Sequence, residues 1–139
     1  MIANTGIVLM NQDLKDLKKI RDHIVGLEMK LDLIKGDLRA VEGDLIFLES
    51  MEINLTENMR ILKQDGIVTK ASEYKKIQIE LDTVNKNLVF YRDVKEQLLR
   101  DLVRYEKITL DAWADYELKK QKYESRQVVL QFDPSKRKK

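Results

Sequence analysis

Hydrophobic residues recur every seven positions through the first half of the chain. With Leu17 as position a of a repeat abcdefg, every a and d position from Leu17 to Leu62 is apolar except Glu52. Seven consecutive heptads exceed the three or four that indicate a coiled coil. The residues expected to form the seam of this first helix are Leu17, Ile20, Ile24, Leu27, Leu31, Ile34, Leu38, Val41, Leu45, Leu48, Leu55 and Leu62.

A turn is predicted at residues 64–69, where the dipeptide Asp65-Gly66 interrupts the repeat. Glycine adopts the left-handed backbone conformation that ends many helices, and Thr69 or Ser72 can cap the helix that follows.

A second, less regular repeat follows this turn. Its seam is expected to contain Ile77, Leu81, Val84, Leu88, Leu98 and Leu102. Lys95 and Thr109 occupy a positions and Lys119 occupies a d position. The neighbouring apolar residues Val94, Leu99, Ile108 and Trp113 indicate that this seam drifts around the helix.

The two repeats together predict an all-α fold, an antiparallel two-helix coiled-coil hairpin over residues 11–125. Helix one is expected at about 11–63 and helix two at about 70–125. A short linker between helices of equal length forces them to run antiparallel. Folding about Asp65-Gly66 places Leu17 near Tyr116 and Leu31 near Val103.

The chain ends, residues 1–10 and 126–139, leave two interpretations open. Residues 6–10 and 128–132 are short, apolar and rich in β-branched side chains. They can pair as a small sheet, since an antiparallel hairpin brings both termini to one end. In the other interpretation, helix one starts earlier and the C-terminal segment packs as coil.

The side of helix one opposite its seam carries almost no charge, with Asp32 as the exception. In a chain with 36% charged residues, a solvent-facing arc should be mostly lysine and glutamate. Each glycine within a helix also costs about 1 kcal/mol relative to alanine. We therefore expect this face to bind a second copy or a partner through Val25, Met29, Leu33, Gly36, Ala40, Gly43 and Phe47.

A homodimer with a two-fold axis near Ala40 is the favoured assembly, because two-fold symmetry is the commonest among homo-oligomers. A trimer or a hetero-assembly is the alternative. Each of these assemblies is a helical bundle, and the heptad pattern does not specify the biological process that it serves.

The side-chain chemistry argues against an enzyme and against any cofactor. The chain has no cysteine and a single histidine, His23, which cannot form the usual zinc sites. Asp111 and Asp115 share one side of a helix, but a two-helix coiled coil offers no water-excluding pocket to change their acidity. Five scattered glycines form no phosphate-binding loop, so no small-molecule substrate is expected.

The aromatic residues Tyr105, Trp113, Tyr116 and Tyr123 gather near one end of the predicted hairpin. They are of the types that anchor protein interfaces, and they are also large enough to fill the seam where it drifts. Both interpretations remain open at this point.

The chain ends in four basic residues, Lys136, Arg137, Lys138 and Lys139, although its net charge is only +2. These four side chains are the candidate phosphate contacts. By themselves they predict only weak, salt-sensitive binding, so nucleic acid is a secondary candidate partner. No membrane is expected as a partner, because no run of about 18 apolar residues is present. Met1–Met10 lacks the basic start of a secretory signal, which predicts a cytoplasmic or virion-internal location.

These observations predict a non-enzymatic coiled-coil structural or assembly protein that binds protein partners, or itself, through helix faces. One alternative is a small dimeric nucleic-acid-associated protein that uses its basic tail. Antiparallel hairpins of this length also resemble, in architecture alone, the stalk proteins of flagellar and type III export. A stalk-like or chaperone-like adaptor is therefore a further alternative.

Overall fold

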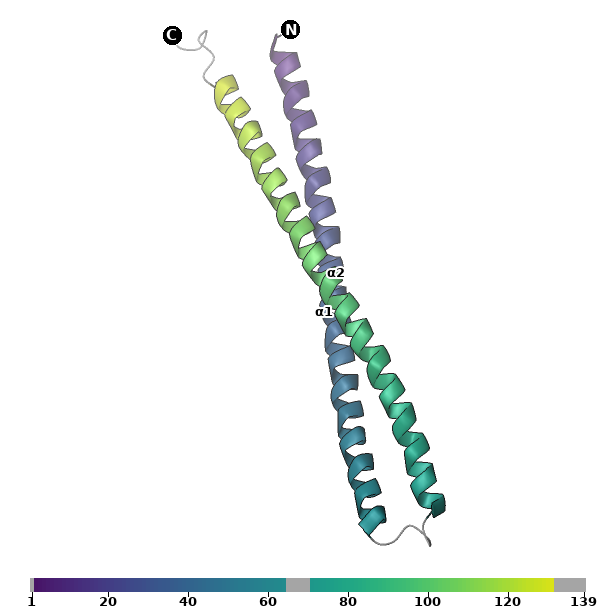
Figure 1. The fold of residues 1–139 in the computed structure, drawn as a ribbon. Helices are drawn as coiled ribbons and strands as arrows, with labels where there is room; N and C mark the ends of the chain where they lie inside the picture. The colour runs from purple at the N-terminus through teal and green to yellow at the C-terminus, as the bar shows by residue number, and fades with distance from the viewer. Residues whose placement is uncertain (1, 65–70, 132–139) are drawn as a thin grey trace. The chain divides into compact units, whose positions relative to one another are not determined.

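The chain is an all-α helical hairpin of two long helices (Figure 1). The computed structural model describes the backbone of residues 2–64 and 71–131, and the side chains of 11–64 and 71–126. Helix α1 spans Ile2–Gln64 and helix α2 spans Ala71–Gln131. No helix among these residues is both long and apolar enough to cross a lipid bilayer.

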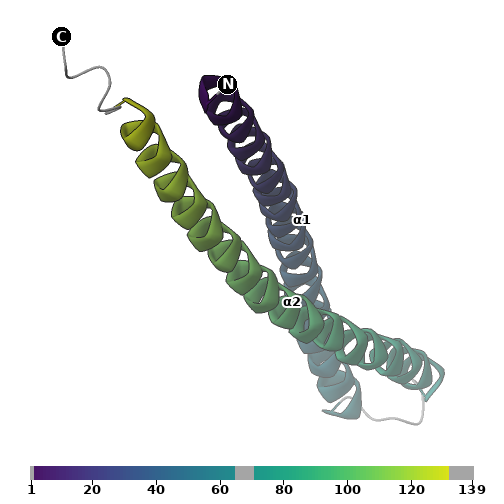
Figure 2. The ribbon, with the colours of Figure 1, turned by 90° about the horizontal axis from the view of Figure 1, so that it is seen from above.

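The contacts between the helices fall into two units. The inner unit consists of Leu33–Leu102, and the terminal unit consists of Met1–Asp32 with Val103–Lys139. In the inner unit Glu49 faces Arg92, and in the terminal unit Glu28 faces Trp113. Glu49 comes later in α1 than Glu28, whereas its partner Arg92 comes earlier in α2 than Trp113. The two helices therefore run antiparallel (Figures 1 and 2).

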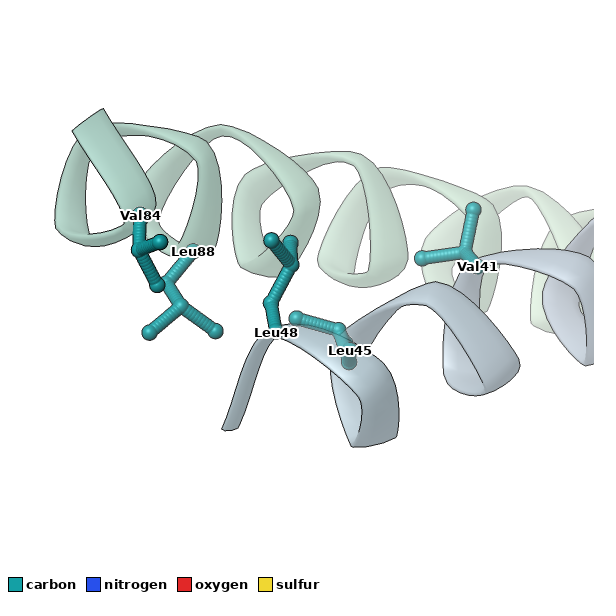
Figure 3. Packing of buried hydrophobic residues seen from close by; sticks show 5 residues of the cluster. All are labelled: Val41, Leu45, Leu48, Val84 and Leu88. Carbon is teal, nitrogen blue, oxygen red and sulfur yellow. The ribbon is translucent and has the colours of Figure 1, made fainter. Parts of the chain in front are cut away.

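The core of the inner unit is a layer of a and d residues from both helices. Val41, Leu45 and Leu48 of α1 pack with Val84 and Leu88 of α2. Figure 3 shows Leu48, Val84 and Leu88 projecting into the space between the helices. Leu88 is only 1% exposed. The partly buried side chains that border this cluster are Met51, Leu55, Tyr91, Val94 and Leu98.

The seam of the terminal unit joins Ile24 of α1, which is 1% exposed, to a half-buried row on α2. That row contains Tyr105, Ala112 and Tyr116. The predicted seam residues of both units are all buried or half-buried. The buried ones are Ile24, Leu27, Leu31, Ile34, Leu38, Val41, Leu45, Leu48, Leu62, Val84 and Leu88.

Two polar residues at a positions of the α2 seam find partners within the hairpin. Thr109 is buried, and its hydroxyl donates a 2.6 Å hydrogen bond to the carbonyl of Tyr105. Lys95 is half-buried and its Nζ lies 3.8 Å from a Glu42 carboxylate oxygen. Leu99 and Ile108 are exposed, so the seam does not drift toward them. Val94, in contrast, is half-buried and packs against the core cluster, as the predicted drift requires.

The register differs from the predicted one in the terminal unit. Leu17 lines a shallow groove with Lys119, Lys122 and Tyr123, whereas Tyr116 was the predicted neighbour. Tyr123 is one heptad beyond Tyr116. The ion pair of Asp13 with Arg126 agrees with this shift, because the predicted register would place Asp13 near Lys120. The helix ends at Gln64 and Ala71 account for only a small part of it.

The helices also extend beyond their predicted ends. Residues 6–10 belong to α1 and residues 128–131 belong to α2, so neither segment is a strand. The earlier start of helix one, expected in the second interpretation, is confirmed. The C-terminal coil expected in the same interpretation is wrong for residues 128–131, which are helical. The predicted turn beyond Gln64, Phe132 and the basic residues 136–139 lie outside the described residues.

Arg126→Gln should lower the free energy of unfolding by about 1 kcal/mol, because Arg126 joins the two helices in the terminal unit. Its Nη1 lies 2.7 Å from both carboxylate oxygens of Asp13, which is half-buried. Urea unfolding measures the change. Arg100→Gln is the control, because Arg100 pairs only with Glu96 of its own helix. Equal losses for the two variants would contradict the prediction.

Candidate protein-binding surface

The side of α1 that faces away from α2 carries a stripe of apolar and small residues in the inner unit. We define the outer stripe as the c and f positions Leu33, Gly36, Ala40, Gly43, Phe47 and Ser50. Leu33 is 70% exposed and Phe47 is 65% exposed. At 100° per residue, c and f lie on the side of the helix opposite a and d. The outer stripe therefore has no contact with the seam of its own hairpin.

The two glycines of the outer stripe are not required by the hairpin. A Cβ atom added at Gly36 or at Gly43 would meet nothing within 4 Å. Each glycine nevertheless costs about 1 kcal/mol of helix stability relative to alanine. The folded single chain thus gives no packing reason for either residue.

Ser50 and the neighbouring residues Ile46 and Ile53 are compatible with an apolar contact at the outer stripe. The Ser50 hydroxyl donates a 3.0 Å hydrogen bond to the Ile46 carbonyl of its own helix, so it does not depend on a partner. Ile46 and Ile53 lie beside the stripe at b positions and are both exposed. Sequence reasoning missed these two isoleucines, because charged Asp32 and Arg39 occupy the preceding b positions.

The charge along the second half of the outer stripe is entirely acidic. Five acids and no base occur from Ala40 to Met59. Two of these acids, Glu42 and Glu49, reach cations of α2, Lys95 and Arg92 respectively. Asp37 and Asp44, at g positions, form an exposed acidic rim on one side of the stripe.

In the terminal unit, the two residues predicted for the same face are also exposed. Val25 and Met29 are both accessible on α1. Of the seven residues that the sequence assigned to a partner face in the two units, only Gly36 is half-buried.

Helix α2 exposes apolar residues that sequence reasoning did not assign to a surface. Phe90, 62% exposed, stacks edge-on against Tyr91 with ring centroids 5.5 Å apart. Leu110 is 69% exposed. The other exposed large apolar residues of α2 are Ile79, Val89, Leu99, Val103, Ile108, Trp113 and Leu118.

The aromatic group divides between the seam and its rim. Tyr105, Tyr116 and Tyr123 are half-buried, whereas Trp113 is exposed. The indole Nε1 of Trp113 donates a 3.0 Å hydrogen bond to Glu28 Oε1, and its ring meets Tyr116 edge-on at 5.7 Å. The tyrosines thus belong to the helix–helix packing, and Trp113 covers its edge.

Neighbouring cations lower the pKa of two side chains, Tyr105 and Glu57. Hydrogen bonds from Lys30 and from Arg104 lower the pKa of Tyr105, and Lys30 Nζ lies 4.5 Å from the ring centroid. A hydrogen bond from Arg60, 3.0 Å from Nε to Oε2, lowers the pKa of Glu57. Glu57 and Arg60 are exposed neighbours on α1, whereas Lys30 of α1 reaches the half-buried Tyr105 of α2.

The histidine and the paired carboxylates come together only on an open face. His23, Asp111 and Asp115 line a shallow groove of the terminal unit with Ile20. All three polar side chains are exposed. Among residues 11–64 and 71–126, no group of three side chains is arranged to hold a metal ion.

The four basic residues proposed as phosphate contacts, 136–139, fall outside the described part of the chain. Comparison with protein-family models, with curated proteins and with solved structures gave no match.

Proposed function

We propose that this chain is a non-enzymatic coiled-coil structural or assembly protein that binds protein through the outer stripe of α1. The observation that carries the proposal is the exposure of Leu33 and Phe47 beside two glycines that the hairpin does not need. A helix that is apolar on two opposite sides is typical of a helix buried between two neighbours.

The balance of apolar side chains supports this proposal. Within the described residues, seventeen large hydrophobic side chains are exposed and eleven hydrophobic ones are buried. More large apolar side chains are therefore accessible than the hairpin buries, and these are available to a partner.

The energy available at the outer stripe is also sufficient. Leu33, Ile46, Phe47 and Ile53 are each about two-thirds exposed. Burying such side chains fully contributes about 1.5–3 kcal/mol each, so the four together contribute about 4–8 kcal/mol when a partner covers them. A partner that contributes similar apolar groups would offset the cost of association.

Leu33→Ser/Phe47→Ser should reduce the amount of bound partner at least about ten-fold, because both substitutions remove apolar area from the centre of the contact. The measurement is cross-linking in the source cells followed by quantitative mass spectrometry, with the chain itself counted among possible partners. Far-UV circular dichroism should stay unchanged, because neither residue touches the seam.

Phe90→Ser/Leu110→Ser is the matched control for this experiment. It removes one phenylalanine and one leucine of nearly equal exposure from α2. The proposal predicts retained binding for this control. Equal losses from both double variants, or no loss from either, would contradict a binding role for the outer stripe. Retention that depends only on residues 136–139 and on low salt would instead indicate nucleic-acid binding.

A further inference from the structure

We infer that the partner of the outer stripe is the outer stripe of a second copy, antiparallel to the first, with a two-fold axis level with Val41 and Glu42. This inference rests on the proposed function, because it names the partner of the same surface. It is carried by the alternation of large and small residues along the stripe, by the free space at the glycines and by the exposed area.

Residue size along the outer stripe alternates in a way that suits an antiparallel copy. The c positions hold Leu33, Ala40 and Phe47, and the f positions hold Gly36, Gly43 and Ser50. Reversing the direction of one helix exchanges the spacings of three and four, so each c residue lies opposite an f residue. Every large side chain then faces a small one, which is the arrangement that fills space without voids or clashes.

A parallel copy would not pack in this way. It would set Phe47 against Phe47 and glycine against glycine, which gives overcrowded and empty layers in turn. Two-fold antiparallel pairing is also self-complementary, because the same patch is used on both copies.

One register satisfies both large residues at once. When Ala40 of each copy lies opposite Gly43 of the other, Phe47 lies opposite Gly36 and Leu33 lies opposite Ser50. These three layers, each occurring twice, use only residues of the inner unit. A shift by one heptad in either direction places Leu33 or Phe47 opposite a residue outside the small set at 36, 43 and 50.

The inferred pairing explains why glycine occupies positions 36 and 43. Small residues at the centre of a helix pair let the two backbones approach closely, and large residues further out fill the widening gap. The space beside Gly36 and Gly43, empty within 4 Å of an added Cβ in the single chain, is the space that Phe47 and Ala40 of the second copy would occupy.

The charges set a specific expectation for this pairing. In the inferred register, Asp37 of one copy lies near Asp44 of the other on the exposed rim. Like charges at a rim oppose association only weakly and are screened by salt. The dimer should therefore persist at about 1 M NaCl, because apolar contacts hold it together.

The primary test is the solution mass by sedimentation equilibrium at a protein concentration of about 100 µM. The wild type should have a mass of about 33 kDa, twice the 16.4 kDa of one chain. Gly36→Gln/Gly43→Gln should raise the dissociation constant at least about a hundred-fold, because both glutamines occupy the central contact. Helix content should be retained, because neither position has a neighbour within the hairpin.

Gly26→Gln is the matched control, because Gly26 is a third helical glycine with no atom within 4 Å of an added Cβ. It is the c position one heptad before Leu33, in the terminal unit, and so lies beyond the three paired layers of the inferred register. This variant should remain a dimer. Asp44→Lys should lower the dissociation constant about three- to ten-fold, because two repulsive pairs with Asp37 become attractive.

Four outcomes would overturn the inference. They are a monomeric wild type, a Gly36→Gln/Gly43→Gln variant that is as dimeric as the wild type, equal dissociation by Gly26→Gln, and weaker association of Asp44→Lys. A monomeric wild type whose cellular partner is lost on Leu33→Ser/Phe47→Ser would point to a different protein on the stripe. In that case the self-pairing would be wrong and the proposed function would stand.

Discussion

Leu88→Ala is expected to lower the free energy of unfolding by about 2–5 kcal/mol. Leu88 is 1% exposed and packs with Val84 of α2 and with Val41, Leu45 and Leu48 of α1. Truncation removes transfer free energy and leaves a cavity that two straight helices cannot easily close. Because the core is only one layer of side chains between two helices, no second layer can compensate. Urea unfolding followed by circular dichroism measures the change.

The control for this prediction is Val89→Ala, one residue further along α2. Val89 is exposed, so its truncation should change stability by no more than about 0.5 kcal/mol. Both variants must be compared with wild type at one protein concentration, because self-association adds a concentration-dependent contribution. A loss at Leu88 as small as that at Val89 would mean that the two helices do not meet along this seam.

The fold was predictable because one physical signal dominates the sequence. A heptad repeat of leucine and isoleucine can bury its apolar side only against another helix, and Asp65-Gly66 is the one strong interruption. The residues that the repeat placed in the seam, such as Ile24 and Leu88, are the most buried in the structure. The heptad pattern therefore predicted both the helical secondary structure and the residues that form the core.

The register and the helix ends were less accessible to sequence reasoning. The position of Leu17 beside Tyr123 depends in part on where α2 begins, and several residues near Thr69 could equally begin a helix. Residues 6–10 combine Gly6 with the β-branched residues Ile7 and Val8, so local preference and continuation of α1 disagree there. Helix propensities are weak and are commonly overridden by the helix that they adjoin.

The sequence indicated the candidate surface only at positions where charged residues are absent. Leu33, Gly36 and Phe47 stood out because their arc lacks lysine and glutamate. Ile46 and Ile53 did not, because Arg39 and Asp32 break their row. On α2 the polar Thr109 suggested a drifting seam, and its hydrogen bond to the Tyr105 carbonyl removes the need for drift at this position. An internally satisfied hydroxyl cannot be read from residue type alone.

Ala40→Pro should lower the free energy of unfolding by about 3 kcal/mol or more, through the backbone alone. Ala40 is exposed on the outer stripe, so the hairpin loses no side-chain packing. Proline at this position cannot donate the hydrogen bond to the carbonyl of Gly36, and its ring collides with that carbonyl. The kink would also separate the a and d residues on either side, Leu38 and Val41, from their partners on α2. Thermal and urea unfolding both measure the effect.

Two controls separate this backbone effect from other causes. Ala40→Gly should cost only about 1 kcal/mol, which is the propensity difference without the steric clash. Ala71→Pro places the same substitution at the first residue of α2. The backbone N–H at this position makes no hydrogen bond within the helix, so its loss should change stability by less than about 0.5 kcal/mol. If Ala40→Pro were tolerated as well as Ala71→Pro, α1 would not be continuous through the outer stripe. The antiparallel pairing of two such stripes would then lose its basis, because their opposing c and f positions require one unbroken helix.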